Sequence, residues 1–436
     1  MPPVVMRDYR GEHLLAVGGR TVSEGRCEIH LDDAFLLIKG TRTNRIGYEE
    51  IETVRLLGRA VEIGLHPDGK VQIAGMDGAL VRPLFLHLSR LRGARWVQLL
   101  RFSEGDPVDS LECKLRLDGG AEQEALFQMY PTGLVGLPLG GEPFQMGVQD
   151  LSAVKMTEDY RLVCAAPEAT AVLYGCEPAD LGRFHRSVEA ARRKAEEETA
   201  NLLSEVFPAL EFAQSAALTA LLLRGKAAAK ADLDAVAPWL WERIEEVIAT
   251  SKKTGESYAY LRKRAGVHLW FGLRRLTESE KRVEEQKPEE APPEEAPAEP
   301  PAEGEPAEPE KPEVQRDYLV WFMAGLKAGA KRFLAVEVVS GTKGFATYVY
   351  RCPTGGSDAE AFADTAAAVS KAMVALNFYR EPLYAPQKDV ETGRFAEYKL
   401  AVRKLPYLRA ARERFAGRAI HTTAAAWQKG LEKLLV

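Results

Sequence analysis

The sequence predicts a multi-domain α+β protein, and three observations lead to that prediction. The chain has 436 residues, a length that suits about two to four domains with a core each. Two stretches that lie one hundred residues apart follow the same pattern, and a segment rich in proline and glutamate divides the chain late in its length. We therefore expect two repeated β-rich domains, a helical region, a disordered linker and a C-terminal α+β domain.

The two related stretches read NRIGYEEIETV from Asn44 and FQMGVQDLSAV from Phe144. Gly47 corresponds to Gly147, and acidic and apolar positions recur at the same offset. Short β-branched runs separated by turn residues surround both stretches, and each set of runs ends in an amphipathic helical pattern. This agreement predicts a duplication, with repeat 1 over residues 10–104 and repeat 2 over residues 105–200.

A meandering antiparallel sheet followed by one C-terminal helix resembles the pleckstrin-homology-like (PH-like) superfold. The phrase formed by Ile46, Tyr48, Ile51 and Val54 is similar to one seen in relatives of that superfold. The resemblance covers residues 10–200 and implies two tandem β-barrels, each plugged at its open end by a capping helix. It also implies the docking of partners and, in some relatives, the binding of phosphoinositide headgroups by basic residues in a turn.

The rest of the chain divides at the proline-rich segment. Residues 201–282 read as a helical bundle, whose third helix runs from Ser257 to Leu276. Residues 283–313 hold nine prolines and no aromatic residue, with 12 Glu against 2 Lys, so we expect a disordered acidic linker. Residues 314–436 carry 19 Lys and Arg against 11 Asp and Glu and predict a basic α+β domain. That domain is expected to open with a helix over YLVWFMAGLKAG.

No pattern of catalysis or metal binding stands out. The seven histidines are dispersed, and the motifs of serine hydrolases, zinc proteases and phosphate loops are absent. We therefore expect a protein that is not an enzyme, with no catalytic residue, cofactor or metal. Five scattered cysteines suit a reducing compartment, and no apolar run approaches the ~20 residues that span a bilayer. A cytoplasmic location is the expectation.

Two basic segments are candidate binding sites. The first is a set near the C-terminus that offers an anion- or phosphate-binding surface. Its members are Arg403, Lys404, Arg409, Arg412, Arg414 and Arg418. The second is a turn of repeat 1 where phosphoinositide-binding PH-like relatives carry basic residues, and it contains Lys39, Arg42 and Arg45. The alternative for the first set is that these cations cover a helix surface and pair with neighbouring acids. Against headgroup binding by the turn, the matching turn of repeat 2 is uncharged apart from Glu142.

These features favour a non-enzymatic binding or scaffold protein that uses tandem PH-like repeats for protein–protein interaction. The first alternative is a nucleic-acid-binding or chromatin protein that acts through the basic C-terminal domain. Tandem PH-like domains beside an acidic tract resemble some eukaryotic histone chaperones. The second alternative is an enzyme with an unrecognised C-terminal site. A protein is the favoured partner, nucleic acid comes next, and membrane lipid is disfavoured, while the sequence leaves the oligomeric state open.

Overall fold

The computed structural model describes residues 8–102, 105–249, 252–276, 317–339 and 346–436. These residues form two compact units. Unit 1 holds the described residues up to Ala195 together with Ala385–Pro406, and unit 2 holds Glu196–Tyr384 and Tyr407–Val436. The disordered linker predicted for residues 283–313 lies outside the described residues.

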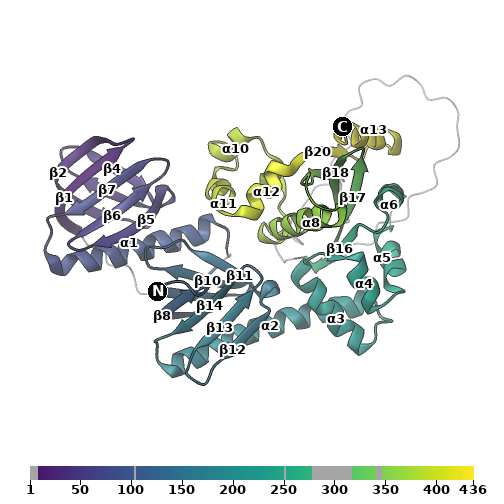
Figure 1. Cartoon of the computed structure of the whole chain (residues 1–436), viewed down its shortest axis with the longest axis horizontal. Coiled ribbons are helices and arrows are strands. Elements are labelled where there is room, and N and C mark those ends of the chain that lie inside the picture. Colours follow the sequence, from purple (N-terminus) through teal and green to yellow (C-terminus); the bar gives the residue numbers. More distant parts are fainter. Residues whose placement is uncertain (1–7, 103–104, 250–251, 277–316, 340–345) are drawn as a thin grey trace. The chain divides into compact units, whose positions relative to one another are not determined.

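Repeat 1 is one curled antiparallel sheet with the strand order β4-β3-β2-β1-β7-β6-β5, and helix α1 lies along it (Figure 1). Its elements are β1 (Asp8–Val17), β2 (Arg20–Leu31), β3 (Phe35–Lys39), β4 (Thr43–Gly47), η1 (Tyr48–Glu50), β5 (Ile51–Leu57), β6 (Ala60–Leu65), β7 (Gly69–Ala74) and α1 (Gly78–Leu99). Inward-facing Val, Ile and Leu from the strands pack against Leu84 and Leu88 of α1, so the helix completes the core.

Repeat 2 has the matching strand order β11-β10-β9-β8-β14-β13-β12, so the predicted duplication is confirmed at the level of topology. Its elements are β8 (Asp109–Leu117), β9 (Gln123–Tyr130), β10 (Gly133–Pro138), β11 (Phe144–Gly147), η2 (Val148–Asp150), β12 (Ala153–Met156), β13 (Leu162–Ala166), β14 (Ala169–Tyr174) and α2 (Pro178–Val206). Gly75 and Gly175 both have a left-handed φ, of 65° and 71°, which explains why glycine recurs between the last strand and the helix.

Unit 2 is built on a six-stranded antiparallel sheet with the order β15-β16-β17-β18-β19-β20. Its strands are β15 (Ala228–Ala229), β16 (Leu269–Arg275), β17 (Tyr318–Ala328), β18 (Lys331–Val339), β19 (Ala346–Arg351) and β20 (Phe415–Ile420). Its helices are α3 (Phe212–Leu222), η3 (Leu223–Gly225), α4 (Lys230–Val236), α5 (Leu240–Ile248), α6 (Lys252–Ala265), α8 (Asp358–Ala375), α9 (Glu381–Tyr384), α12 (Pro406–Arg414) and α13 (Ala424–Leu434). Strand β16 pairs with β17, so one sheet joins residues that the sequence analysis assigned to two domains.

Two predicted helices are strands, which corrects the sequence analysis. The run YLVWFMAGLKAG forms β17, and the end of the predicted third helix of the bundle forms β16. Both strands are buried on almost every residue. A strand covered on both faces reads as a continuous apolar run, which periodicity does not distinguish from a buried helix.

The segment Ala385–Pro406 belongs to unit 1, although both of its chain neighbours belong to unit 2. It contains α10 (Gln387–Glu391), η4 (Ala396–Tyr398) and α11 (Lys399–Lys404). Its contacts lie on repeat 1 and on the junction between the repeats. Among the helices of the described residues, none is long and apolar enough to cross a membrane.

Candidate functional site

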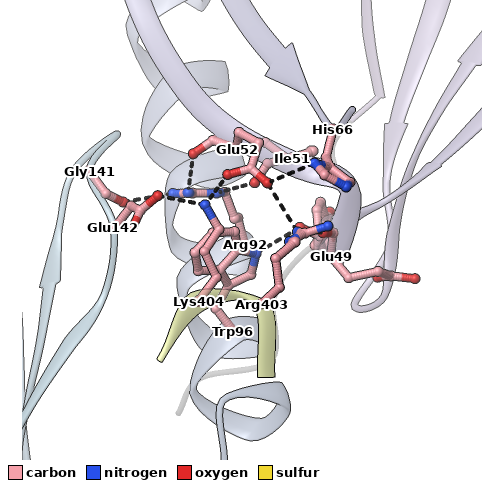
Figure 2. Close-up of polar contacts among 11 residues, drawn as sticks. Glu49, Ile51, Glu52, His66, Arg92, Trp96, Gly141, Glu142, Arg403 and Lys404 are labelled. Carbon is pink, nitrogen blue, oxygen red and sulfur yellow. Dashed lines mark hydrogen bonds and ion pairs between the residues drawn. The ribbon is translucent and has the colours of Figure 1, made fainter. Parts of the chain in front are cut away.

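The junction between the two repeats is organised by Arg92 of α1, whose exposed fraction is 1%. Its Nε donates to the carbonyl of Ile51 at 2.9 Å and its Nη2 to that of Glu52 at 2.5 Å. Its Nη1 donates to the carbonyl of Gly141, in the β10–β11 turn of repeat 2, at 2.7 Å (Figure 2). Burial lowers the pKa of Arg92 to about 10, against the opposing effect of Glu142 and Glu52, so the side chain remains a cation at neutral pH.

The β10–β11 hairpin of repeat 2 therefore docks on repeat 1, between β5 and α1. Gly140 has a φ of 75°, and a Cβ there would lie well inside van der Waals distance of the Val54 carbonyl oxygen. The close approach thus requires a glycine. Leu137 covers Gly93 of α1 in the same contact.

Helix α11 adds two cations to this junction. The Nη2 of Arg403 lies 3.0 Å from the carbonyl oxygen of Glu49 and 3.0 Å from the Glu52 carboxylate. Lys404 pairs with the same Glu52 carboxylate and with Glu142 of repeat 2, the latter at 2.7 Å (Figure 2). The side chains of Arg403, Lys404 and Glu52 are each at most about one quarter exposed. Solvent and salt therefore screen their ion pairs less than they would screen pairs at the surface. We call the set Arg92, Glu52, Glu142, Arg403 and Lys404 the junction cluster.

Two rings border the junction cluster. The buried Trp96 donates from Nε1 to the carbonyl of Tyr48 at 2.8 Å, and the Lys404 ammonium lies 5.4 Å from the Trp96 ring centre. His66 Nδ1 lies 3.7 Å from the Glu52 carboxylate. Desolvation and the nearby Arg403 lower the pKa of His66, although Glu52 opposes them. The cluster is thus a set of mutually satisfied charges that holds three chain segments together.

The six cations predicted near the C-terminus are divided between the two units. Arg403 and Lys404 belong to unit 1 and take part in the junction cluster. The other four belong to unit 2, with Arg409, Arg412 and Arg414 on α12 and Arg418 on β20.

The partners of Arg412, Arg414 and Arg418 lie within unit 2. Arg412 donates to the carbonyl of Pro382, Arg414 lies 2.8 Å from the Asp364 carboxylate, and Arg418 lies over the ring of Tyr384. Arg414 and Arg418 lie on different elements, because α12 ends at Arg414 and β20 begins at Phe415.

The predicted basic turn of repeat 1 is the β3–β4 hairpin, and it is exposed. Lys39, Arg42 and Arg45 form no ion pair within the described part of the chain, and Arg45 lies 3.9 Å over the ring of Phe35. Their counterparts one hundred residues later lie in or beside the β10–β11 turn that docks on repeat 1. The same hairpin position is therefore occupied in one repeat and open in the other.

Sequence reasoning missed a buried polar cluster in unit 2. Its centre is Glu337 of β18, with an exposed fraction of 4%. The carboxylate accepts from Ser257 at 3.0 Å, from Thr347 and from Nε2 of His421 at 3.1 Å. The available signal was a lone glutamate within the apolar run FLAVEVV, because a charge is buried in a central strand only when it is paired.

The chain matches no protein-family model and no curated protein. Among the described residues, no group of three or more His, Cys, Asp or Glu side chains could hold a metal ion. The function of this protein is therefore inferred from the geometry of its own residues.

Proposed function

We propose that this protein is a non-enzymatic binding or scaffold protein whose tandem repeats are PH-like domains. Two features support the PH-like assignment. Each repeat has a seven-stranded antiparallel sheet in the same strand order, and each sheet is followed directly by one long helix. The junction cluster supports the scaffold role, since it fixes both repeats into one platform rather than leaving them on a flexible tether.

The observation that carries this proposal is a difference between the two repeats: the same hairpin is docked in repeat 2 and exposed in repeat 1. In repeat 2 the β10–β11 hairpin already binds protein, because Gly140 and Gly141 dock on repeat 1. In repeat 1 the corresponding β3–β4 hairpin is exposed, and β4 has β3 as its single neighbour in the described sheet. Its edge can accept an added strand.

The charge of the hairpin indicates the kind of partner. Lys39, Arg42 and Arg45 all carry positive charge at this hairpin and form no ion pair among the described residues, although Glu28 of β2 lies opposite Lys39. A partner segment with an extended backbone and acidic side chains complements both features. The partner of the proposal is therefore an acidic protein segment that pairs with β4.

Photo-cross-linking in native lysate tests this proposal. A photoreactive residue at Thr41, in the β3–β4 turn, should capture a protein partner, and replacing Lys39, Arg42 and Arg45 by Glu should abolish the capture. A photoreactive residue at Arg59, in the β5–β6 turn of the same repeat, is the matched control and should capture nothing. Binding to phosphoinositide vesicles in place of a protein would redirect the function to membranes.

A second candidate function is the binding of single-stranded nucleic acid, and an aromatic stack in unit 2 favours it. Tyr348 and Tyr384 stack with their ring centres 5.4 Å apart. Arg380 lies over Tyr348 at 4.8 Å, and Arg418 lies over Tyr384 at 5.2 Å. Interleaved arginines and aromatic rings are the elements of a single-strand platform. Tyr348 is buried, so the half-buried Tyr384 is the ring of this stack that a base could reach.

The full chain is needed to test this second function, because removal of β16 would expose the edge of β17. Affinity for a single-stranded oligonucleotide should fall steeply with salt, by a slope of about 0.7 per neutralised phosphate. Replacing Arg380 and Arg418 by Ala should flatten that slope, whereas the exposed Arg351 serves as the control. Absence of salt-dependent binding would remove this candidate.

A further inference from the structure

The buried cluster around Glu337 borders a small hollow on the surface of unit 2. The hollow opens to solvent, and its enclosed part has room for about 20 Å³. It lies between the middle of α6 and the start of α13, and its lining residues are Glu256, Ser257, His421, Thr422, Thr423, Ala424 and Trp427. That space suits a single polar group about the size of a water molecule, at the end of a side chain or of a small ligand, rather than a large cofactor.

The hydrogen bonds of the cluster determine which nitrogen of His421 carries a proton. Trp427 donates to the Thr347 hydroxyl at 2.7 Å, and the hydroxyl hydrogen of Thr347 goes to the Glu337 carboxylate, which lies closer to it than Nε2 of His421 does at 3.3 Å. Ser257 also points its hydroxyl at the Glu337 carboxylate. A carboxylate surrounded by donors acts as an acceptor, so Nε2 of His421 donates to it.

Nδ1 is then the open nitrogen of His421. The side chain is held firmly, with an exposed fraction of 8% and its ring stacked on Trp427 at 5.0 Å. Among the described residues, Nδ1 has no hydrogen-bond partner. In the neutral imidazole that carries its proton on Nε2, this atom is an acceptor.

The charges at the hollow select the ligand. Glu337 lies behind His421, and Glu256 lines the hollow without an ion pair in the described residues. No Lys or Arg occurs among the lining residues. An anion would therefore meet two carboxylates, whereas a cation with N–H donors would meet acceptors at His421, Glu256 and the Thr422 hydroxyl. The ring of Trp427 provides an apolar wall for an alkyl stem.

We infer that the hollow binds a primary ammonium group, with Nδ1 of His421 and the carboxylate of Glu256 as its acceptors. The ammonium belongs either to a lysine side chain or to a small free amine. This site lies in unit 2 and does not depend on the hairpin proposed to bind a partner protein.

Calorimetric titration of the full-length protein tests the site. The probes are methylamine and the lysine analogue N-acetyl-lysine methylamide, and the corresponding norleucine compound, which lacks the ammonium, is the control. Affinities on the order of 1–10 mM are expected for such small ligands. A tighter lysine analogue would point to a lysine side chain as the source, and equal affinity would point to a free amine.

Two substitutions separate binding from folding. His421→Gln keeps a donor toward Glu337 and removes Nδ1, while Glu256→Gln changes an exposed residue and leaves the cluster intact. Each should weaken ammonium binding at least about tenfold, since His421→Gln removes the Nδ1 acceptor and Glu256→Gln removes the negative charge that faces the ammonium. Glu242→Gln, on the exposed face of α5, is the matched control and should bind like the wild type.

Long-range ¹⁵N NMR of histidine-labelled protein reports the tautomer independently of affinity. The expected result is a proton on Nε2 of His421 and a shift of Nδ1 when the amine is added. Three results would overturn the inference: binding of the norleucine compound with equal affinity, binding of acetate in preference to the amine, or amine binding that survives both His421→Gln and Glu256→Gln.

Discussion

The guanidinium of Arg92 in repeat 1 donates a hydrogen bond of 2.7 Å to the backbone carbonyl of Gly141 in repeat 2. The same group satisfies the carbonyls of Ile51 and Glu52, at the start of an edge strand. One side chain thus supplies donors to three carbonyls that would otherwise be desolvated without partners.

Replacing Arg92 by Met should lower the free energy of unfolding of unit 1 by about 3 kcal/mol, because three carbonyls and the Glu142 and Glu52 carboxylates lose their buried cation. Urea unfolding followed by tryptophan fluorescence measures this change. The control is Arg90→Met on the same helix, where the side chain is 53% exposed and pairs with Glu112 at the surface. That change should cost less than about 1 kcal/mol, and equal losses for the two variants would contradict the role of Arg92.

Gly140→Ala should destabilise the junction by more than the cost of placing an alanine in a left-handed backbone conformation, because the new Cβ would also collide with repeat 1. Gly140 and Gly119 have similar φ values, of 75° and 71°, but only the former approaches a backbone atom of repeat 1. Gly119→Ala should therefore cost about 1 kcal/mol, from backbone strain, and Gly140→Ala at least about 2 kcal/mol. Thermal unfolding of the two variants measures the difference, and matching melting temperatures would mean that the hairpin docks without close contact.

Glu52 and Lys404 should be energetically coupled by about 1 kcal/mol in a double-mutant cycle of Glu52→Gln and Lys404→Met. The coupling is expected because both side chains are less than one quarter exposed. Hydrogen exchange of α11 should quicken in each single variant. The pair Arg82 and Glu124, at the surface of the same unit, is the comparison and should show a smaller coupling that vanishes in high salt.

Unit 1 should lose stability as the pH falls through the range in which histidine ordinarily titrates, and His66 should account for part of the loss. The pKa of His66 is lowered in the folded state, so the unfolded chain binds the proton more readily and acid favours unfolding. His66→Gln should therefore lose less stability than the wild type between about pH 7 and pH 5. Urea midpoints at the two pH values test this, and parallel losses in both proteins would exclude His66 as a cause.

The repeat architecture was predictable because its signals are local and occur twice. Gly47 and Gly147 have φ values of −66° and −62°, and each precedes a 3₁₀ turn. The alternating apolar pattern places corresponding positions in the cores of both repeats. A single occurrence of either signal would have meant little. Their common offset is what made the duplication readable.

The junction cluster was not predictable, because its members are far apart in sequence and individually ordinary. Arg403 and Lys404 read as part of a basic surface, yet their partner Glu52 lies in another element more than three hundred residues away. Nothing in the sequence singled out Arg92, because one polar residue on an amphipathic helix is ordinary. The sheet of unit 2 was hidden for a different reason, since β16 and β17 are apolar on both faces and lack the alternation that marks a strand.

Because Ala385–Pro406 belongs to unit 1, repeat 1 emerges from the ribosome long before the last segment of its own unit. Lys404 follows Glu52 by 352 residues. At elongation rates of about 5–20 residues per second, Glu52 emerges from the ribosome roughly 20 to 70 s before its cation does. Repeat 1 therefore spends most of translation with Arg92 as the sole cation of the junction cluster beside Glu52, and nascent chains released before residue 385 never acquire Arg403 and Lys404.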